Sequence, residues 1–338
     1  MLTVIAGLVL FGVLITVHEL GHFLMAKATG MQVDEFAIGF GPLLVQKKIG
    51  DTLYSLRLFP LGGYNKIAGM EPGEVCGPRG FNNKPLLSRM LVILAGPFMN
   101  FVLPFLIFFL LFAVSGVDRP LDTPVAGSLM ANYPAAQAGL KPGDRIVSIN
   151  GKAMVKWTDI GDTIRERGES QSSLVVNRNG KTYTFSIIPK REKETKRLLL
   201  GIRPPVEHQD LTLAQSVKAA ALSIERITTG MLQGLKLIIT RKAPAELSGP
   251  IGVAQMAGDV ASQGAVPYLG FMAFLSLNLA VLNLLPIPAL DGGQFLVLLL
   301  EGIIGHALPP RAKLAIQWVG IACILSLTVF ATMQDLIR

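Results

Sequence analysis

The chain has 338 residues, of which 51% are hydrophobic and only 16% are charged, and its mean hydropathy is +0.50. A soluble globular domain carries about 25% charged residues, so this composition excludes intrinsic disorder and argues against an ordinary soluble enzyme. Two cysteines, Cys76 and Cys323, are too few for a disulfide framework or a cysteine-rich zinc module. The formal net charge of +8 is compatible with binding of nucleic acid. In an apolar chain, however, basic residues typically mark cytoplasmic loops, so we expect an integral membrane protein without a nucleic-acid partner.

Four stretches are apolar over the roughly 20 residues that a helix needs to cross a bilayer. The first lacks the basic segment and the small-residue cleavage pattern of a signal peptide and runs into His18 and Glu19, so we expect a retained helix. The third contains Pro286 and Pro288, which predict a break in its helix. The predicted spans are 1–26, 90–117, 260–304 and 314–334, and 305–313 forms a short loop between the last two.

The basic residues of the short connections between these spans predict the orientation, because long segments cross a membrane largely regardless of their charge. The segment 27–89 holds eight lysines and arginines, and the loop after the third span holds Arg311 and Lys313. The positive-inside rule therefore predicts that both connections are cytoplasmic. The N-terminus and the long segment between the second and third spans are then extracytoplasmic.

The segment 27–89 does not resemble a plain cytoplasmic loop. Gly41-Pro42 and Gly50-Asp51 separate strand-like stretches at 33–40, 43–48 and 52–58. This pattern predicts a membrane-associated β-hairpin region. We expect the hairpin at 33–58 to pair with an unwound peptide by strand addition, so that proline placed in its 52–58 strand should impair cleavage without loss of zinc.

The segment 118–205 predicts a separate small α+β domain, because alternating polar and apolar residues are interrupted by Asn-Gly turn signals. The expected elements are strands at 145–149, 173–177 and 182–188, turns at Asn150-Gly151 and Asn179-Gly180, a helix at 158–167 and a solvated charged run at 190–197. The following segment, 206–259, predicts an amphipathic helix at 211–239 and a linker. That helix lies either on the outer membrane surface or against the small domain.

The strongest motif is His18-Glu19-Leu20-Gly21-His22 in the first span. On a helix the two histidines share a face, so both imidazoles can bind one zinc ion, and Glu19 lies beside them as a candidate general base. The alternative is a structural cluster of His and Glu side chains between helices. Ionisable groups are costly inside a membrane and usually functional there, so we favour zinc.

A catalytic zinc needs a third protein ligand. The sequence offers His208 in the small domain, His306 near the cytoplasmic loop, and Asp291 just after the broken part of the third span. Asp291 could instead only cap the helix that follows the break. The motifs at His18 and Asp291, together with Asn100 in the second span, are predicted to lie at a similar depth in the membrane, which favours Asp291.

These motifs together resemble the site-2 protease family of intramembrane zinc metalloproteases, and most closely its RseP-like bacterial branch. The resemblance covers nearly the whole chain. It rests on the HExxH sequence, Gly96-Pro97 and Asn100, the NxxPxPxLDG sequence at 283–292, Gly39-Phe40-Gly41-Pro42, Leu61-Gly62-Gly63-Tyr64 and the segment 247–252.

The resemblance implies that His18, His22 and Asp291 are zinc ligands and that Glu19 is the general base. It implies that Asn100 and Asn283 bind substrate or lie near the metal site, although each could instead form hydrogen bonds between helices. It also implies that the small domain is a single PDZ module, where the type member of the branch has two. This module either binds a peptide or excludes substrates with large ectodomains.

The predicted fold is thus a polytopic α-helical membrane protein with four transmembrane helices, a membrane-associated β-hairpin region and an inserted extracytoplasmic PDZ domain. The predicted function is zinc-dependent cleavage of the transmembrane segments of single-span proteins, such as anti-sigma factors or remnant signal peptides, in the bacterial inner membrane. The rival hypotheses are a zinc or proton transporter and an inactive PDZ scaffold. A Glu19→Gln variant separates them, because it should keep metal and lose proteolysis.

Overall fold

The computed structural model describes residues 1–71, 73–74, 76–192, 198–242 and 248–337. The chain divides into a membrane unit, Met1–Val114 with Thr212–Arg338, and an inserted unit, Ser115–Leu211. The inserted unit is wider than the predicted domain of 118–205, because residues on both sides of that domain also form strands. Two predicted features lie outside the described residues, namely the end of the charged run at 193–197 and Leu247 of the segment 247–252.

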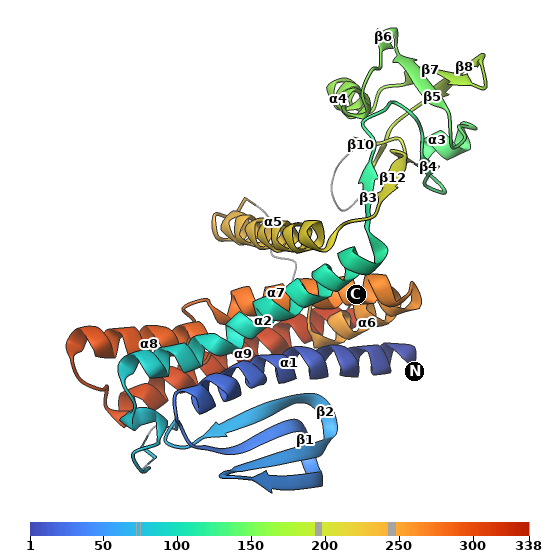
Figure 1. The fold of residues 1–338 in the computed structure, drawn as a ribbon. Coiled ribbons are helices and arrows are strands. Elements are labelled where there is room, and N and C mark those ends of the chain that lie inside the picture. The colour runs from blue at the N-terminus through green and yellow to red at the C-terminus, as the bar shows by residue number, and fades with distance from the viewer. Residues whose placement is uncertain (72, 75, 193–197, 243–247, 338) are drawn as a thin grey trace. The chain divides into compact units, whose positions relative to one another are not determined.

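Within the described part of the chain, four helices are long and apolar enough to cross a membrane, in agreement with the prediction. They are α1 (Leu2–Ala28), α2 (Leu86–Ser115), α7 (Ala265–Asn283) and α9 (Pro310–Ile337) (Figure 1). Their surfaces carry many exposed large apolar side chains. Lipid can cover such surfaces, whereas water cannot do so without a large free-energy cost.

The predicted third span, 260–304, is not one helix. The structure divides this part of the chain into α6 (Pro250–Ser262), α7, a loop of irregular backbone, and α8 (Asp291–Ile304). Pro286 and Pro288 stand in the loop, where their missing N–H groups and fixed φ angles prevent a continuous helix. Of these three helices only α7 is long enough to span a bilayer.

Helix α6 lies where the sequence predicted part of a linker, and small residues bring it close to α1. A Cβ atom at Gly7 would contact Ala254, and one at Gly258 would overlap Thr3. Close approach at small residues is a common way for membrane helices to associate. The N-terminus of α6 is capped by Asp335, whose carboxylate accepts hydrogen bonds from the backbone N–H groups of Gly249 and Gly252.

The β-hairpin region consists of two long strands, β1 (Val33–Ile49) and β2 (Thr52–Ile67). Both strands change register along their length, so that four segments form one sheet in the order 43–49, 52–57, 33–38 and 63–67. Tyr54, for example, pairs with Phe36 on one side and with Lys47 on the other. The sequence did not predict that β2 continues past Pro60 to Ile67.

This order shows which parts of the sheet could add a strand. The two outer segments are 43–49, inside the predicted 33–58 hairpin, and 63–67, beyond it. The 52–57 segment is paired on both sides and has no free edge, whereas 63–67 pairs only with 33–38 within the described residues. β2 also packs along α1, where a Cβ atom at Gly12 would overlap the carbonyl oxygen of Pro60. The short 3-10 helix Phe81–Asn83 then leads into α2.

Helix α5 (Leu213–Ile239) begins with a capping box between Thr212 and Gln215 and contacts α7.

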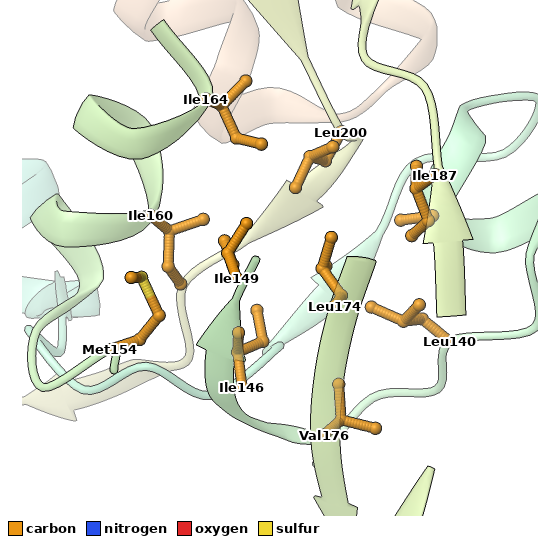
Figure 2. Close-up of a cluster of buried hydrophobic side chains, with 11 residues drawn as sticks. Leu140, Ile146, Ile149, Met154, Ile160, Ile164, Leu174, Val176, Ile187 and Leu200 are labelled. Atoms are coloured by element: carbon orange, nitrogen blue, oxygen red, sulfur yellow. The ribbon is translucent and has the colours of Figure 1, made fainter. Parts of the chain in front are cut away.

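The inserted unit is built around a four-stranded antiparallel sheet with the order β6-β5-β7-β8. Its buried core is aliphatic, and Figure 2 shows Ile146 and Ile149 of the sheet beside Ile160 of α4, with Val176 near Leu140. The elements of this unit are β3 (Val117–Pro120), β4 (Ser128–Leu129), α3 (Pro134–Gln137), β5 (Arg145–Ile149), β6 (Lys152–Ala153), α4 (Trp157–Arg167), β7 (Ser172–Arg178), β8 (Lys181–Ile187), β9 (Lys190–Arg191), β10 (Leu198–Leu199), β11 (Ile202–Arg203) and β12 (Val206–Gln209). The predicted strands and helix of this domain thus differ from the structure by one residue or less at their ends.

Candidate metal centre

Two histidines project from the same face of α1, one helical turn apart. The backbone of α2 fixes the orientation of His22, because its Nδ1 atom lies 2.8 Å from the carbonyl oxygen of Val92. A carbonyl oxygen can only accept, so Nδ1 carries the hydrogen and donates it. The other ring nitrogen, Nε2, then keeps its lone pair free for a metal.

His18 is held from the same side by Asn100, which is fully buried. The side-chain amide of Asn100 lies 3.2 Å from Nδ1 of His18, and the backbone carbonyl of Asn100 accepts a hydrogen bond from Ser276. The structure places Nδ2 of Asn100 at Nδ1 of His18, and Oδ1 of Asn100 has no hydrogen-bond partner among the described residues. A histidine that binds metal through Nε2 must donate from Nδ1, so a 180° turn of the amide would bring Oδ1 to accept from that group. Which end of the amide faces the ring is assigned from the hydrogen-bond network.

Glycine allows α2 to approach both imidazoles. Val92, Gly96 and Asn100 are spaced by four residues and therefore share one face of α2. A Cβ atom at Gly96 would overlap the rings of both His18 and His22. α1 contributes a second close approach, because a Cβ atom at Gly21 of α1 would overlap the backbone of α2 at Ala95. The Gly96-Pro97 motif thus has a steric explanation.

The loop 284–290 delivers Asp291 to the histidines. Ala289 has φ +71°, an uncommon conformation for a residue with a side chain, and the glycines that follow Asp291 pack closely against the loop backbone. α8 begins at Asp291 itself and its N-cap is Leu290, so Asp291 is not the N-cap that the alternative interpretation required. Its Oδ2 atom instead lies 3.1 Å from Nε2 of His18 and 3.6 Å from Nε2 of His22.

These three side chains fit a tetrahedral metal ion. The Nε2 atoms of His18 and His22 are 3.2 Å apart, and the three candidate ligand atoms all lie within 4.8 Å of one another. Two ligand atoms about 2.0–2.1 Å from zinc lie about 3.3 Å apart at the tetrahedral angle. Oδ2 of Asp291 is buried and has no hydrogen-bond partner among the described residues. A buried carboxylate oxygen facing two imidazole nitrogens is a suitable donor set for zinc.

The other two candidate ligands lie elsewhere. His208 belongs to the inserted unit and contacts Asp118 and Asp210, and the hydrogen bond to Asp118 raises the pKa of His208. His306 follows α8, is exposed, and its ring is within hydrogen-bond distance of the Ala307 carbonyl. In the described part of the chain, only His18, His22 and Asp291 form a cluster that could hold a metal.

A cavity of about 270 Å³ opens beside this cluster. Glu19 and Asn283 line it, whereas the buried Asn100 does not. Its remaining lining includes Asn65 and Ile67 of β2 and Gln294 of α8, none of which the sequence singled out. The only local signal for Asn65 is that asparagine is uncommon in a strand. Its place at the site depends on the fold of β2.

A larger cavity of about 750 Å³ adjoins the first and shares five of its lining residues. The shared residues are Asn65, Ile67, Met70, Ala289 and Gln294. The far side of the larger cavity reaches Arg89 and Lys313, which both contact the buried carboxylate of Glu301. Together the two cavities extend from the metal cluster to the start of α9.

Comparison with known proteins supports a protease. The model of peptidase family M50 matches residues 6–327. The regulator of sigma-W protease RasP of Bacillus subtilis is 32% identical over 417 residues, covering 99% of this chain and 98% of its own length. The zinc metalloprotease RasP of Bacillus licheniformis is 31% identical, with 99% of each chain covered. A protein of Clostridium acetobutylicum, provisionally named a zinc metalloprotease, is 35% identical over 335 residues, with 99% and 97% covered.

A helical membrane protein with a buried His-His-Asp cluster and these relatives is a membrane-embedded metalloprotease. The chain belongs to peptidase family M50, the site-2 proteases. It is a multi-pass bacterial membrane protein and a zinc-dependent intramembrane endopeptidase. This assignment favours the protease over the transporter and the scaffold.

Proposed function

We propose that His18, His22 and Asp291 hold the zinc ion and that Glu19 is the general base. The observation that supports this assignment is the close grouping of two Nε2 atoms and one carboxylate oxygen beside a cavity that Glu19 also lines. Zinc bound there would lower the pKa of a coordinated water to about 7 and polarise the scissile carbonyl. Glu19 accepts a proton as the water oxygen adds to the carbonyl carbon. It then donates the proton to the amine nitrogen as the C–N bond breaks.

The two asparagines have different proposed roles. Asn283 ends α7 and lines the cavity with the metal cluster, so it is the one in position to contact a substrate. Asn100 is fully buried behind His18. We therefore assign Asn100 a positioning role, as the group that orients His18, in place of the substrate contact expected from the sequence.

The substrates are single-span membrane proteins such as anti-sigma factors or remnant signal peptides. A transmembrane helix hides its carbonyl groups in its own hydrogen bonds, so it must unwind before it can be cleaved. Of the two outer segments of the sheet, 63–67 is the one that pairs with the unwound segment, because Asn65 and Ile67 line the cavity and no residue of 43–49 does.

The proposed location is the bacterial inner membrane, with the N-terminus and the inserted unit extracytoplasmic. The support is that both short connections on one side carry basic residues, eight in 27–89 and Arg311 and Lys313 at the start of α9. The proposed domains are those of the sequence analysis, except that the third span is α7 and the inserted unit is Ser115–Leu211, which we propose to be a single PDZ module. In that unit the turn at Leu200-Gly201-Ile202, with Gly201 at φ +80°, corresponds to the loop that would receive a peptide carboxylate.

Whether that module excludes large ectodomains or binds a peptide is tested with substrates that share one transmembrane segment and differ in ectodomain length. We favour the size filter, which predicts that cleavage falls as the ectodomain grows. If cleavage instead depends on a free C-terminal carboxylate and not on length, the module is a peptide-binding site.

The zinc content of the purified chain tests the metal site. We expect about one zinc per wild-type chain in detergent, much less for Asp291→Ala, and a normal content for Glu19→Gln. Glu19→Gln should also abolish cleavage and retain uncleaved substrate. If the folded wild type binds no zinc at neutral pH after metal is supplied, the proposed site is wrong. If Glu19→Gln cleaves at the wild-type rate, Glu19 is not the base.

A further inference from the structure

Asn65 lies at the junction of the two cavities, on one of the two outer edges of the β-sheet. It pairs with Phe36 through the backbone of β2, and it is one of the five residues that line both the metal-cluster cavity and the larger cavity. A peptide chain that runs from one cavity to the other would pass among these five residues.

The carboxamide of Asn65 has no partner. Both its Oδ1 and its Nδ2 atoms are buried, and neither forms a hydrogen bond within the described ranges. A buried polar group without a hydrogen bond is destabilising, and an apolar side chain of similar size would avoid that penalty. Such a group in a folded protein calls for an explanation, and binding of a ligand is one that its position supports.

The chemistry of the unpaired group identifies its ligand. A primary amide presents one acceptor and one donor side by side, which matches the N–H and C=O groups of a peptide backbone. It carries no charge, so it would not disturb the charge of the metal cluster. A substrate helix unwound at the site exposes such backbone groups in pairs, and they too need partners in a membrane.

We propose that the Asn65 carboxamide binds a main-chain peptide group of the substrate next to the scissile bond and so positions the unwound chain at the metal centre. This inference rests on the proposed function, since it presupposes that the cavity beside His18, His22 and Asp291 is where the peptide is cleaved. It adds a substrate-binding residue outside the metal-binding motifs. The sheet thus contributes a side chain as well as an edge.

The first test compares Asn65→Leu with wild type and with Gln46→Leu. Gln46 is an exposed carboxamide on the same sheet and lines neither cavity, so its variant controls for a change on the sheet that leaves the site untouched. We expect all three proteins to hold about one zinc. Asn65→Leu should lower kcat/KM for a single-span peptide about 10-fold or more, while its melting temperature stays equal to or above that of wild type. A purely structural Asn65 would give the opposite result, a lower melting temperature with unchanged kcat/KM.

The second test locates the partner with ester-substituted peptides, in which oxygen replaces one backbone N–H at a time on either side of the scissile bond. At one position the ester should lower kcat/KM of wild type about 10-fold and leave Asn65→Leu unaffected, because the contact is already lost. If every ester affects both proteins equally, or if Asn65→Leu cleaves like wild type, the inference is wrong and the proposed function still stands. If zinc-loaded wild type cleaves none of the single-span peptides, both fail.

Discussion

The Nδ1 atom of His22 lies 2.8 Å from the carbonyl oxygen of Val92, although the two residues are 70 positions apart in the chain. Through this contact the backbone of α2 orients a side chain of α1. It leaves Nε2 of His22 directed at Nε2 of His18 and Oδ2 of Asp291. The HExxH sequence supplies the two histidines, and contacts with α2 set the orientation of their rings.

Gly96 is predicted to be essential for metal binding. In Gly96→Ala the new methyl group would overlap both imidazoles, so we expect the zinc affinity to fall at least about 10-fold and cleavage to be lost. Gly270→Ala in α7 is the matched control, because a Cβ atom there meets nothing within 4 Å. The measurement is zinc per chain during titration with a competing chelator. Wild-type affinity in Gly96→Ala would contradict the close packing of α2.

Replacing Asn100 should weaken zinc binding, although Asn100 is not itself a proposed zinc ligand. Loss of the partner of a metal-binding histidine typically lowers affinity by about 10–100-fold, and we expect this for Asn100→Ala. Asn100→Asp should retain most of the affinity, because a carboxylate can still accept from Nδ1 of His18. Ser276→Ala controls for the loss of a buried hydrogen bond, since the Ser276 hydroxyl donates to the backbone carbonyl of Asn100 and not, within the described residues, to its side-chain amide. Equal affinities for the alanine and aspartate variants would show that Asn100 does not orient His18.

The left-handed conformation of Ala289 predicts opposite effects of two substitutions. Ala289→Gly should keep zinc and cleavage and leave the melting temperature unchanged or higher, because glycine adopts φ +71° without strain. Ala289→Val places a branched side chain in the same conformation, which costs on the order of 1–3 kcal/mol and should displace Asp291. Thermal unfolding and zinc content measure both effects. An Ala289→Val protein with normal zinc content would show that the loop does not control Asp291.

The inserted unit should lose stability in acid through one ion pair. Nε and Nη2 of Arg178 donate to the two carboxylate oxygens of Asp144, which is fully buried. These hydrogen bonds lower the pKa of Asp144, more than its burial raises it. An unfolded aspartate titrates near pH 3.9, so the pair stabilises the folded unit fully above about pH 4. That contribution is lost as the pH falls through the pKa of Asp144 in the folded unit, which lies below the value in the unfolded chain.

Hydrogen exchange of the amides in Ser115–Leu211 can follow this loss. Arg178→Met should destabilise the unit by about 2–3 kcal/mol at neutral pH, because a buried carboxylate loses its partner, and should weaken the acid dependence. Arg165→Met is the control, since its pair with Asp162 is exposed and contributes little. The ion pair is unimportant if the two variants exchange at the same rates at neutral pH.

Much of this protein could be predicted from the sequence, because the relevant signals are local. Membrane helices follow from long apolar runs, and the hairpins of the inserted unit follow from alternation around Asn-Gly turns. The pairing of His18 with His22 needs only the period of one helix. The break around Pro286 and Pro288 follows from the chemistry of proline.

Other features were decided by contacts between residues far apart in the chain. The sequence offered Asp291, His208 and His306 as a third ligand, and only packing of α8 against α1 selects among them. It predicted strand addition by the 33–58 hairpin, whereas the register of β1 and β2 makes 63–67, beyond that hairpin, the outer segment beside the cavity. Asn65 became a candidate only when the folded sheet brought it to the cavities. Local sequence determines which groups the chain carries and how each segment folds. The tertiary structure determines which of them meet, because close packing and strand pairing depend on segments that are remote in sequence.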